Sequence, residues 1–240
     1  FADRVNQLPL GIVGVAVGTA LLPLMSRQLR AEDESAVMAS QNRAIEFSLF
    51  LTLPAAVALM VIAEPIISVL FERGAFDATS VAATAGALAI YASGLPAYVL
   101  VKALAPGYFA REDTATPVKI AVFALALNLG LNLLLMGPFL HLGIAVATAV
   151  SAWCNALLLA YVLRRRGHLV LDARIKSRLP RMIAASLAMG AAVYFGADAF
   201  KMMLESGLSS KIFAVAILVS GGLILYGGLS LIFGAASRQD

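Results

Sequence analysis

Long apolar segments separated by short polar connections dominate the hydrophobic pattern of this chain. Seven of them have about the length that a helix needs to cross the hydrocarbon of a bilayer, roughly 17–25 residues. They are Leu8–Leu24, Phe47–Ala63, Ala78–Val101, Ile120–Leu140, Leu142–Leu163, Met182–Ala197 and Ile212–Phe233. Gly and Pro interrupt several segments, but membrane-spanning helices tolerate both. The pattern therefore predicts seven transmembrane helices and no strands, which is an all-α integral membrane protein.

Composition supports a membrane protein that is not an enzyme. The chain is 61% hydrophobic and 13% charged, whereas soluble domains carry about 25% charged residues. No HExxH, P-loop, nucleophile elbow or dinucleotide fingerprint occurs, and the single cysteine, Cys154, excludes a disulfide within the chain. A membrane polyprenyl-phosphate transferase would need a carboxylate pair near the cytoplasmic surface. Glu112-Asp113, the only such pair near a substrate-like loop, lacks flanking ligands, so we expect neither a catalytic site nor a cofactor.

The distribution of basic residues predicts the orientation in the membrane. Of the 18 Lys and Arg residues, 14 flank the first, third and fifth connections or follow the last span. Because Lys and Arg collect in cytoplasmic loops, the chain is expected to start outside and to end in the cytoplasm. Anionic membrane lipids are the natural partners of such clusters, and the net charge of +4 requires no nucleic acid.

The connections carry signals for helix ends and turns. Asp77 is expected to cap the third span, and Thr116 followed by Pro117 predicts the start of the fourth. Gly137-Pro138 predicts a tight turn, with the chain reversal centred near Leu140. The segment His168–Arg181 alternates apolar and basic residues and is expected to lie along the inner interface. Phe1 is not an initiator Met and already stands within a helical pattern, so we interpret the chain as the C-terminal part of a longer protein.

The first span carries charges close to its outer end. At the helical period, one face of about 80° contains Arg4, Gln7, Gly11, Gly14 and Gly18, with Asp3 at its edge. The GxxxG pair Gly14 and Gly18 predicts close approach by another helix, which places Arg4 on the protein-facing side. Two interpretations remain open. Arg4 either extends to the outer headgroups beside Asp3, or it binds an anionic headgroup through its fork of donors.

The fourth and fifth spans each carry a polar face. Asn128 and Asn132 lie on the fourth, and Thr148, Ser151 and Asn155 lie on the fifth. With the turn centred near Leu140, Asn132 is expected at the depth of Thr148 and Asn128 at that of Ser151, so the two faces should meet. A structural hydrogen-bonded contact is the preferred interpretation, because no carboxylate is present to neutralise a cation. The alternative is a small cation site, with sodium bound by Asn128, Asn132 and Thr148.

Two longer motifs and a short one carry a family resemblance. The first 23 residues resemble the eighth transmembrane helix of the lipid II flippases, the MurJ (MviN) family. Their sequence is FADRVNQLPLGIVGVAVGTALLP. The segment VKALAPGYFAREDTATPVKIA is similar to that family's loop between its tenth and eleventh helices, and FERGAF (Phe71–Phe76) lies between the two in the expected order. The resemblance extends over essentially the whole chain, although the last two spans are less diagnostic.

The resemblance implies a seven-helix part of a fourteen-helix fold of the multidrug and polysaccharide exporter type. Residues 1–166 would form second-lobe helices, 167–181 a cytoplasmic interfacial linker and 182–240 two extra helices, while the N-terminal lobe lies in the missing part of the protein. The function implied is movement of lipid II from the inner to the outer leaflet of the bacterial inner membrane by alternating access, for cell-wall synthesis. Export of drugs or of another polyprenyl-linked saccharide is the alternative.

The resemblance also assigns roles to residues. Arg4 matches the cavity arginine implicated in holding the diphosphate, with Asp3 and Gln7 beside it. Some members have a sodium site, and Asn128, Asn132 and Thr148 fall at the matching positions. This chain has Asn132 where such a site would use a carboxylate.

Overall fold

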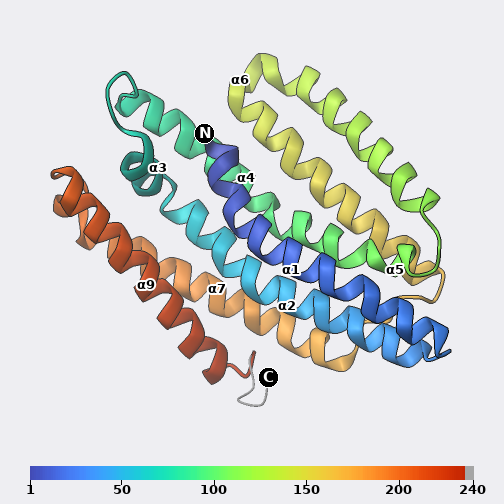
Figure 1. Cartoon of the computed structure of the whole chain (residues 1–240). Coiled ribbons are helices and arrows are strands. Elements are labelled where there is room, and N and C mark those ends of the chain that lie inside the picture. Colours follow the sequence, from blue (N-terminus) through green and yellow to red (C-terminus); the bar gives the residue numbers. More distant parts are fainter. Residues whose placement is uncertain (236–240) are drawn as a thin grey trace.

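The computed structural model describes residues 1–235, which form helices and connections without any strand in that range (Figure 1). The helices are α1 (Ala2–Arg30), α2 (Glu34–Val61), α3 (Ala63–Phe71), α4 (Ala78–Leu104), α5 (Pro106–Phe109), α6 (Ala115–Arg165), α7 (Ala173–Ala199), α8 (Lys201–Leu204) and α9 (Leu208–Ile232). The seven apolar segments coincide with α1, α2, α4, the two halves of α6, α7 and α9. The prediction of an all-α fold is therefore confirmed.

Helix α6 consists of two antiparallel spans. Its 51 residues would extend about 75 Å as one straight helix, far beyond the roughly 30 Å of a bilayer core. Leu140 has non-helical dihedral angles (φ 51°, ψ −130°), and the chain reverses there (Figure 1). Within the described residues, five helical segments are long and apolar enough to cross a membrane, and α6 is one of them. The chain is thus a multi-pass membrane protein.

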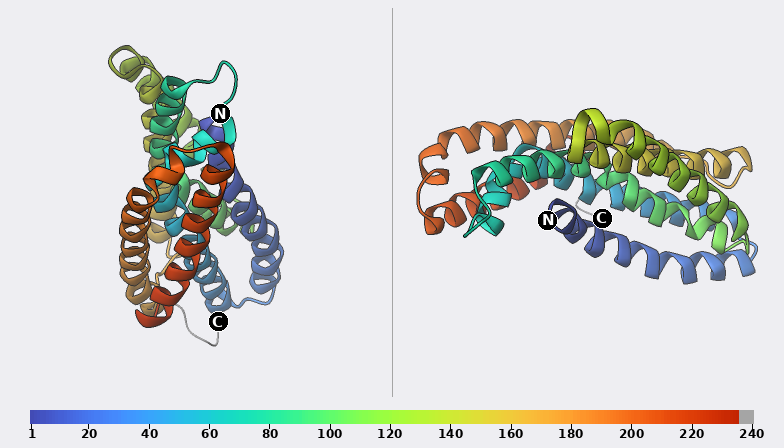
Figure 2. Two further views of the ribbon diagram at one scale, coloured as in Figure 1. Left: turned by 90° about the vertical axis from the view of Figure 1, so that its left-hand side faces the viewer. Right: turned by 90° about the horizontal axis from the view of Figure 1, so that it is seen from above.

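Helix α4 lies at the centre of the bundle. It packs against α1, α2, α3 and α6, and its approach to α6 depends on Gly94. A Cβ atom at Gly94 would lie 3.1 Å from the Cα atom of Ala149. Helices α7 and α9 form a pair that contacts α2 and α3 (Figure 2). The Tyr226 hydroxyl of α9 donates to the Phe50 carbonyl of α2 at 2.8 Å, which ties this pair to the other helices.

The helix ends agree only in part with the sequence predictions. Asp77 caps α4 as expected, because its carboxylate accepts from the Ser80 amide at 2.9 Å. The prediction that Thr116 caps the fourth span is wrong. Helix α6 starts earlier, at Ala115, and the Asp113 carboxylate accepts from the Thr116 amide at 3.0 Å. Gly137 and Pro138 remain helical, and the reversal is at Leu140.

Helix α7 begins inside the segment for which an interfacial linker was expected. Asp172 is its N-cap, with the carboxylate accepting from the Ile175 amide at 2.8 Å. Residues 173–181 are therefore the first turns of α7, continuous with the span that follows them. This continuity brings the basic residues of these turns against α2 rather than leaving them in a separate connection.

The basic connections gather at one end of the bundle. The turn after α1, the α5 region and the connection between α6 and α7 meet there (Figure 1), joined by contacts such as that between Asn42 and the Val170 carbonyl at 2.8 Å. The N-terminus, the loop after α3 and the α6 reversal lie at the opposite end. A single basic end is what the distribution of Lys and Arg requires.

Candidate functional site

The first turns of α1 present a charged face and an apolar face. Ala2 and Val5 are buried, and the Phe1 ring packs on Phe71 and Phe76 with ring centroids 4.9 and 5.5 Å apart. These contacts fix the end of α1 against α3 and the loop that follows it. The opposite face, which carries Asp3, Arg4 and Gln7, is exposed.

Arg4 and Asp3 do not pair with each other. Gln7 Nε2 donates to Asp3 Oδ2 at 2.5 Å, so the acid is engaged by the amide one turn further along α1. Within residues 1–235, the Arg4 guanidinium forms no hydrogen bond or ion pair with another side chain. Its planar fork of donors therefore remains open to a ligand, and phosphate oxygens fit such a fork in pairs.

The glycine face of α1 does not pack against a neighbouring helix as predicted. Close approach by a helix at both Gly14 and Gly18 was expected, but a Cβ atom at Gly18 would meet nothing within 4 Å. At Gly14 the neighbour is a side chain rather than a backbone. A Cβ atom there would lie 2.4 Å from Cδ of Lys102. The prediction of a close helix contact at this GxxxG pair is wrong for the described residues, and Gly14 instead makes room for Lys102.

The two polar faces of the α6 hairpin meet as expected. Asn128 Nδ2 donates to the Thr148 hydroxyl at 3.4 Å, and Asn132 Nδ2 donates to Asn128 Oδ1 at 2.9 Å. The Thr148 hydroxyl donates in turn to the Ile144 carbonyl at 2.7 Å. The predicted contact between the two faces is therefore confirmed, but the pairing differs by one turn, because Asn128 rather than Asn132 donates to Thr148.

A cavity of about 420 Å³ continues from this network. Ser151 and Asn155 line it together with Asn128 and Thr148 from α6, and residues of α1 and α4 complete it. Ser151 Oγ and Asn155 Oδ1 are buried and have no hydrogen-bond partner in the described chain, and neither has Asn132 Oδ1 beside the cavity. The site thus contains more hydrogen-bond acceptors than the surrounding side chains satisfy.

Lys102 is a cavity residue that the sequence did not indicate. It was assigned to the basic residues flanking the third connection, but α4 continues to Leu104. Lys102 therefore belongs to the last turn of a spanning helix, and it lines the cavity with Tyr98 and Val101. The apolar residues on both sides of Lys102 were the one signal in the sequence that the helix continues past it.

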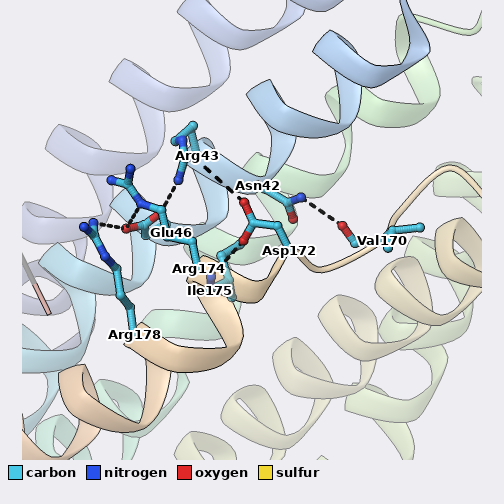
Figure 3. Close-up of polar contacts among 8 residues, drawn as sticks. All are labelled: Asn42, Arg43, Glu46, Val170, Asp172, Arg174, Ile175 and Arg178. Carbon is cyan, nitrogen blue, oxygen red and sulfur yellow. Dashed lines mark hydrogen bonds and ion pairs between the residues drawn. The ribbon is translucent and has the colours of Figure 1, made fainter.

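A second cluster that sequence reasoning missed surrounds Glu46 at the basic end (Figure 3). Its side chain is only 8% exposed and accepts from three arginines. Arg43 of α2 lies at 2.9 Å, and Arg174 and Arg178 of α7 lie at 3.1 and 2.6 Å. Asp172 lies 4.0 Å from Arg43. A charge that is buried in this way needs its partners, so the cluster fixes α7 to α2.

The acidic pair of the third connection has a structural role. Asp113 caps α6 and accepts from Arg166 at 2.5 Å. Hydrogen bonds from Thr116 and Arg166 hold the pKa of the Asp113 carboxyl well below its usual range. Glu112 has a positive φ of 60° at the turn. Within residues 1–235, no three His, Cys, Asp or Glu side chains are grouped so that they could hold a metal ion.

The comparison with known families decides the assignment. The model of the family described as "Lipid II flippase MurJ" matches residues 1–215. The chain belongs to the MurJ family. Among curated relatives, a probable lipid II flippase MurJ of Rhizobium meliloti is 45% identical over 239 residues, which cover 99% of this chain and 45% of the relative. A probable lipid II flippase MurJ of Rickettsia prowazekii is 34% identical over 236 residues, 98% of this chain and 46% of the relative.

A solved structure shares the fold. The lipid II flippase MurJ in an inward closed conformation superposes with a TM-score of 0.76 at 24% identity, covering 97% of this chain and 45% of that one. This likeness confirms the fold expected from the sequence. The chain spans slightly less than half of the length of the MurJ relatives that it matches.

The FERGAF motif forms a turn and several contacts between helices. FERGAF ends α3 and forms the turn in which Gly74 has a positive φ of 57°, while its two phenylalanines pack on Phe1. Glu72 of the same motif accepts from Lys211 of α9 at 2.7 Å, and this bond, together with one from Ser68, lowers the pKa of the Glu72 carboxyl. The motif therefore joins α1, α3 and α9 at the end opposite to the basic one.

Proposed function

We propose that the full-length protein containing this chain moves lipid II from the inner to the outer leaflet of the bacterial inner membrane by alternating access. Membership of the MurJ family supports this function, and the observation in this chain that carries it is the exposed, unpaired guanidinium of Arg4. Asp3 is occupied by Gln7, so Arg4 offers its full charge and its fork to the diphosphate of the substrate. The N-terminal lobe of the same protein would supply the other wall of a substrate cavity around Arg4.

Substitutions of Arg4 test this proposal. In cells that depend on the full-length protein, Arg4→Ala is expected to reduce the appearance of lipid II at the outer leaflet by roughly 10- to 100-fold, the worth of one charged hydrogen-bonded contact. Arg4→Lys should restore only part of the activity, because a point charge cannot form two parallel bonds. Lys201→Ala is the control, since Lys201 lies at the same end and, among the described residues, forms only an exposed pair with Glu205 at 3.9 Å. Normal lipid II translocation by Arg4→Ala would refute the role of Arg4.

The orientation belongs to the same proposal: the basic end and the C-terminus face the cytoplasm. A cysteine at position 171, introduced as Leu171→Cys in a Cys154→Ser background, should react with a membrane-impermeant thiol reagent only after the membrane is opened. The connection between α6 and α7 that contains it lies at the basic end. Labelling from the periplasm in intact cells would reverse the orientation, and Ala75→Cys in the loop after α3, where the side chain is exposed, provides the opposite control.

A further inference from the structure

The cavity beside the α6 hairpin has an excess of acceptors. Ser151 is 6% exposed, and its hydroxyl oxygen, together with Asn155 Oδ1 and Asn132 Oδ1, has no partner among the described residues. Leaving buried oxygens unsatisfied in a membrane interior is unfavourable. Oxygens of this kind attract a cation or a hydrogen-bond donor, and no side chain in the described range donates to them.

Lys102 is the one charged side chain among the residues that line this cavity. Its methylene groups pass over Gly14, where a Cβ atom would lie 2.4 Å from Cδ and 2.9 Å from Cε. The side chain can adopt this course only because residue 14 is glycine. Its ammonium forms no ion pair or hydrogen bond with any residue in the described range.

The helix geometry directs Lys102 toward the unsatisfied oxygens. Gly94 of α4 lies against Ala149 of α6, and both helices run toward the basic end from that contact. Lys102 therefore lies at about the level of the turn that follows Asn155 on α6. Helical side chains tilt toward the N-terminus of their helix, which brings the long lysine stem back to the level of Asn155 and Ser151. An ammonium group donates hydrogen bonds and accepts none, so its chemistry is complementary to the site.

We propose that Lys102 is a tethered cation for this cavity, whose ammonium binds Asn155 Oδ1 and Ser151 Oγ in one state of the transport cycle and leaves them in another. The proposal rests on the function proposed above and adds a residue to its machinery. A lysine built into the protein then supplies the positive charge that this group of neutral oxygens would otherwise take from a sodium ion. It follows that transport by this protein does not depend on sodium.

The test compares the full-length wild type with Lys102→Met in sodium chloride and in potassium chloride of equal concentration. Methionine keeps most of the stem but removes the charge. For the wild type, both the unfolding temperature and the rate of lipid II translocation are expected to be the same in the two salts. Lys102→Met should translocate at least about tenfold more slowly in potassium, the loss of one charged contact. It should also gain a sodium-specific rise in unfolding temperature, because a ligand that binds only the folded state stabilises it.

Two further variants distinguish a tethered cation from a lysine that binds the substrate. Lys119→Met removes an exposed lysine in the first turns of α6 and should behave as the wild type in both salts. Lys102→Met combined with Asn155→Leu should lose the sodium-specific stabilisation. The proposal is overturned if the wild type requires sodium, if Lys102→Met is fully active in potassium, or if that variant is impaired without any response to sodium, which would indicate that Lys102 binds substrate phosphate. The unfolding measurements remain informative even if the wild type translocates no lipid II.

Discussion

Replacing Glu46 with alanine is expected to lower the free energy of unfolding of the full-length protein by about 3 kcal/mol, the lower end of the usual cost of removing one partner of a buried ion pair, because Arg43 and Arg174 are 48% and 31% exposed. The reason is the number of charges that share this one carboxylate. Arg43, Arg174 and Arg178 all lie within 3.1 Å of its oxygens. In the variant they lose this common acceptor, and the attachment of α7 to α2 weakens (Figure 3).

Thermal unfolding of the purified full-length protein in detergent measures this effect. Glu205→Ala is a suitable control, because Glu205 is 67% exposed and lies 3.9 Å from Lys201. Exposed pairs of this kind contribute about 0–1 kcal/mol. Glu46→Gln keeps the shape of the side chain and should be nearly as damaging as alanine if charge is what matters. Equal unfolding temperatures for Glu46→Ala and the wild type would show that the cluster does not hold the two helices together.

The spans could be predicted from the sequence because hydrocarbon imposes a simple requirement. A backbone in the bilayer has to satisfy its own hydrogen bonds, so each long apolar segment becomes a helix. The helix ends could not be predicted in this way. Helix α2 starts at Glu34, well before the apolar segment that begins at Phe47, because α1 and α4 pack along its polar first turns. Hydropathy indicates which residues lie in the hydrocarbon of the bilayer, whereas contacts between helices determine at which residue the helix begins.

The same distinction applies to the candidate sites. The meeting of the two polar faces of α6 could be predicted because a tight hairpin brings residues of equal depth together, but the pairing could not, since Thr148 accepts from Asn128 rather than from Asn132. The Glu46 cluster could not be predicted, because it joins residues of α2 and α7 that are more than a hundred positions apart in the chain. Its arginines had been interpreted only as signals of orientation. Lys102 was missed for a similar reason, because its place in the cavity depends on how α1 and α4 meet at Gly14.

Gly143 is the position in the hairpin at which a single methyl group is expected to do most damage. A Cβ atom there would lie 2.4 Å from the Leu135 carbonyl oxygen and 2.6 Å from its carbonyl carbon. These are backbone atoms of the opposite half of α6, so they cannot move aside as a side chain can. Gly143→Ala should therefore force the two spans apart and cost about 3 kcal/mol, the upper part of the usual range for overpacking.

Gly137 provides the matched control in the same hairpin. It is helical, and a Cβ atom there would meet nothing within 4 Å, so Gly137→Ala should stabilise the protein by about 0.5–1 kcal/mol through helix propensity. Unfolding temperatures of the two variants should thus move in opposite directions. Opening of the hairpin would also separate Asn128 from Thr148, and cysteines at these positions, in a Cys154→Ser background, should then cross-link poorly with a short reagent. If Gly143→Ala is as stable as the wild type and cross-links equally well, the close approach of the two spans at Leu135 is refuted.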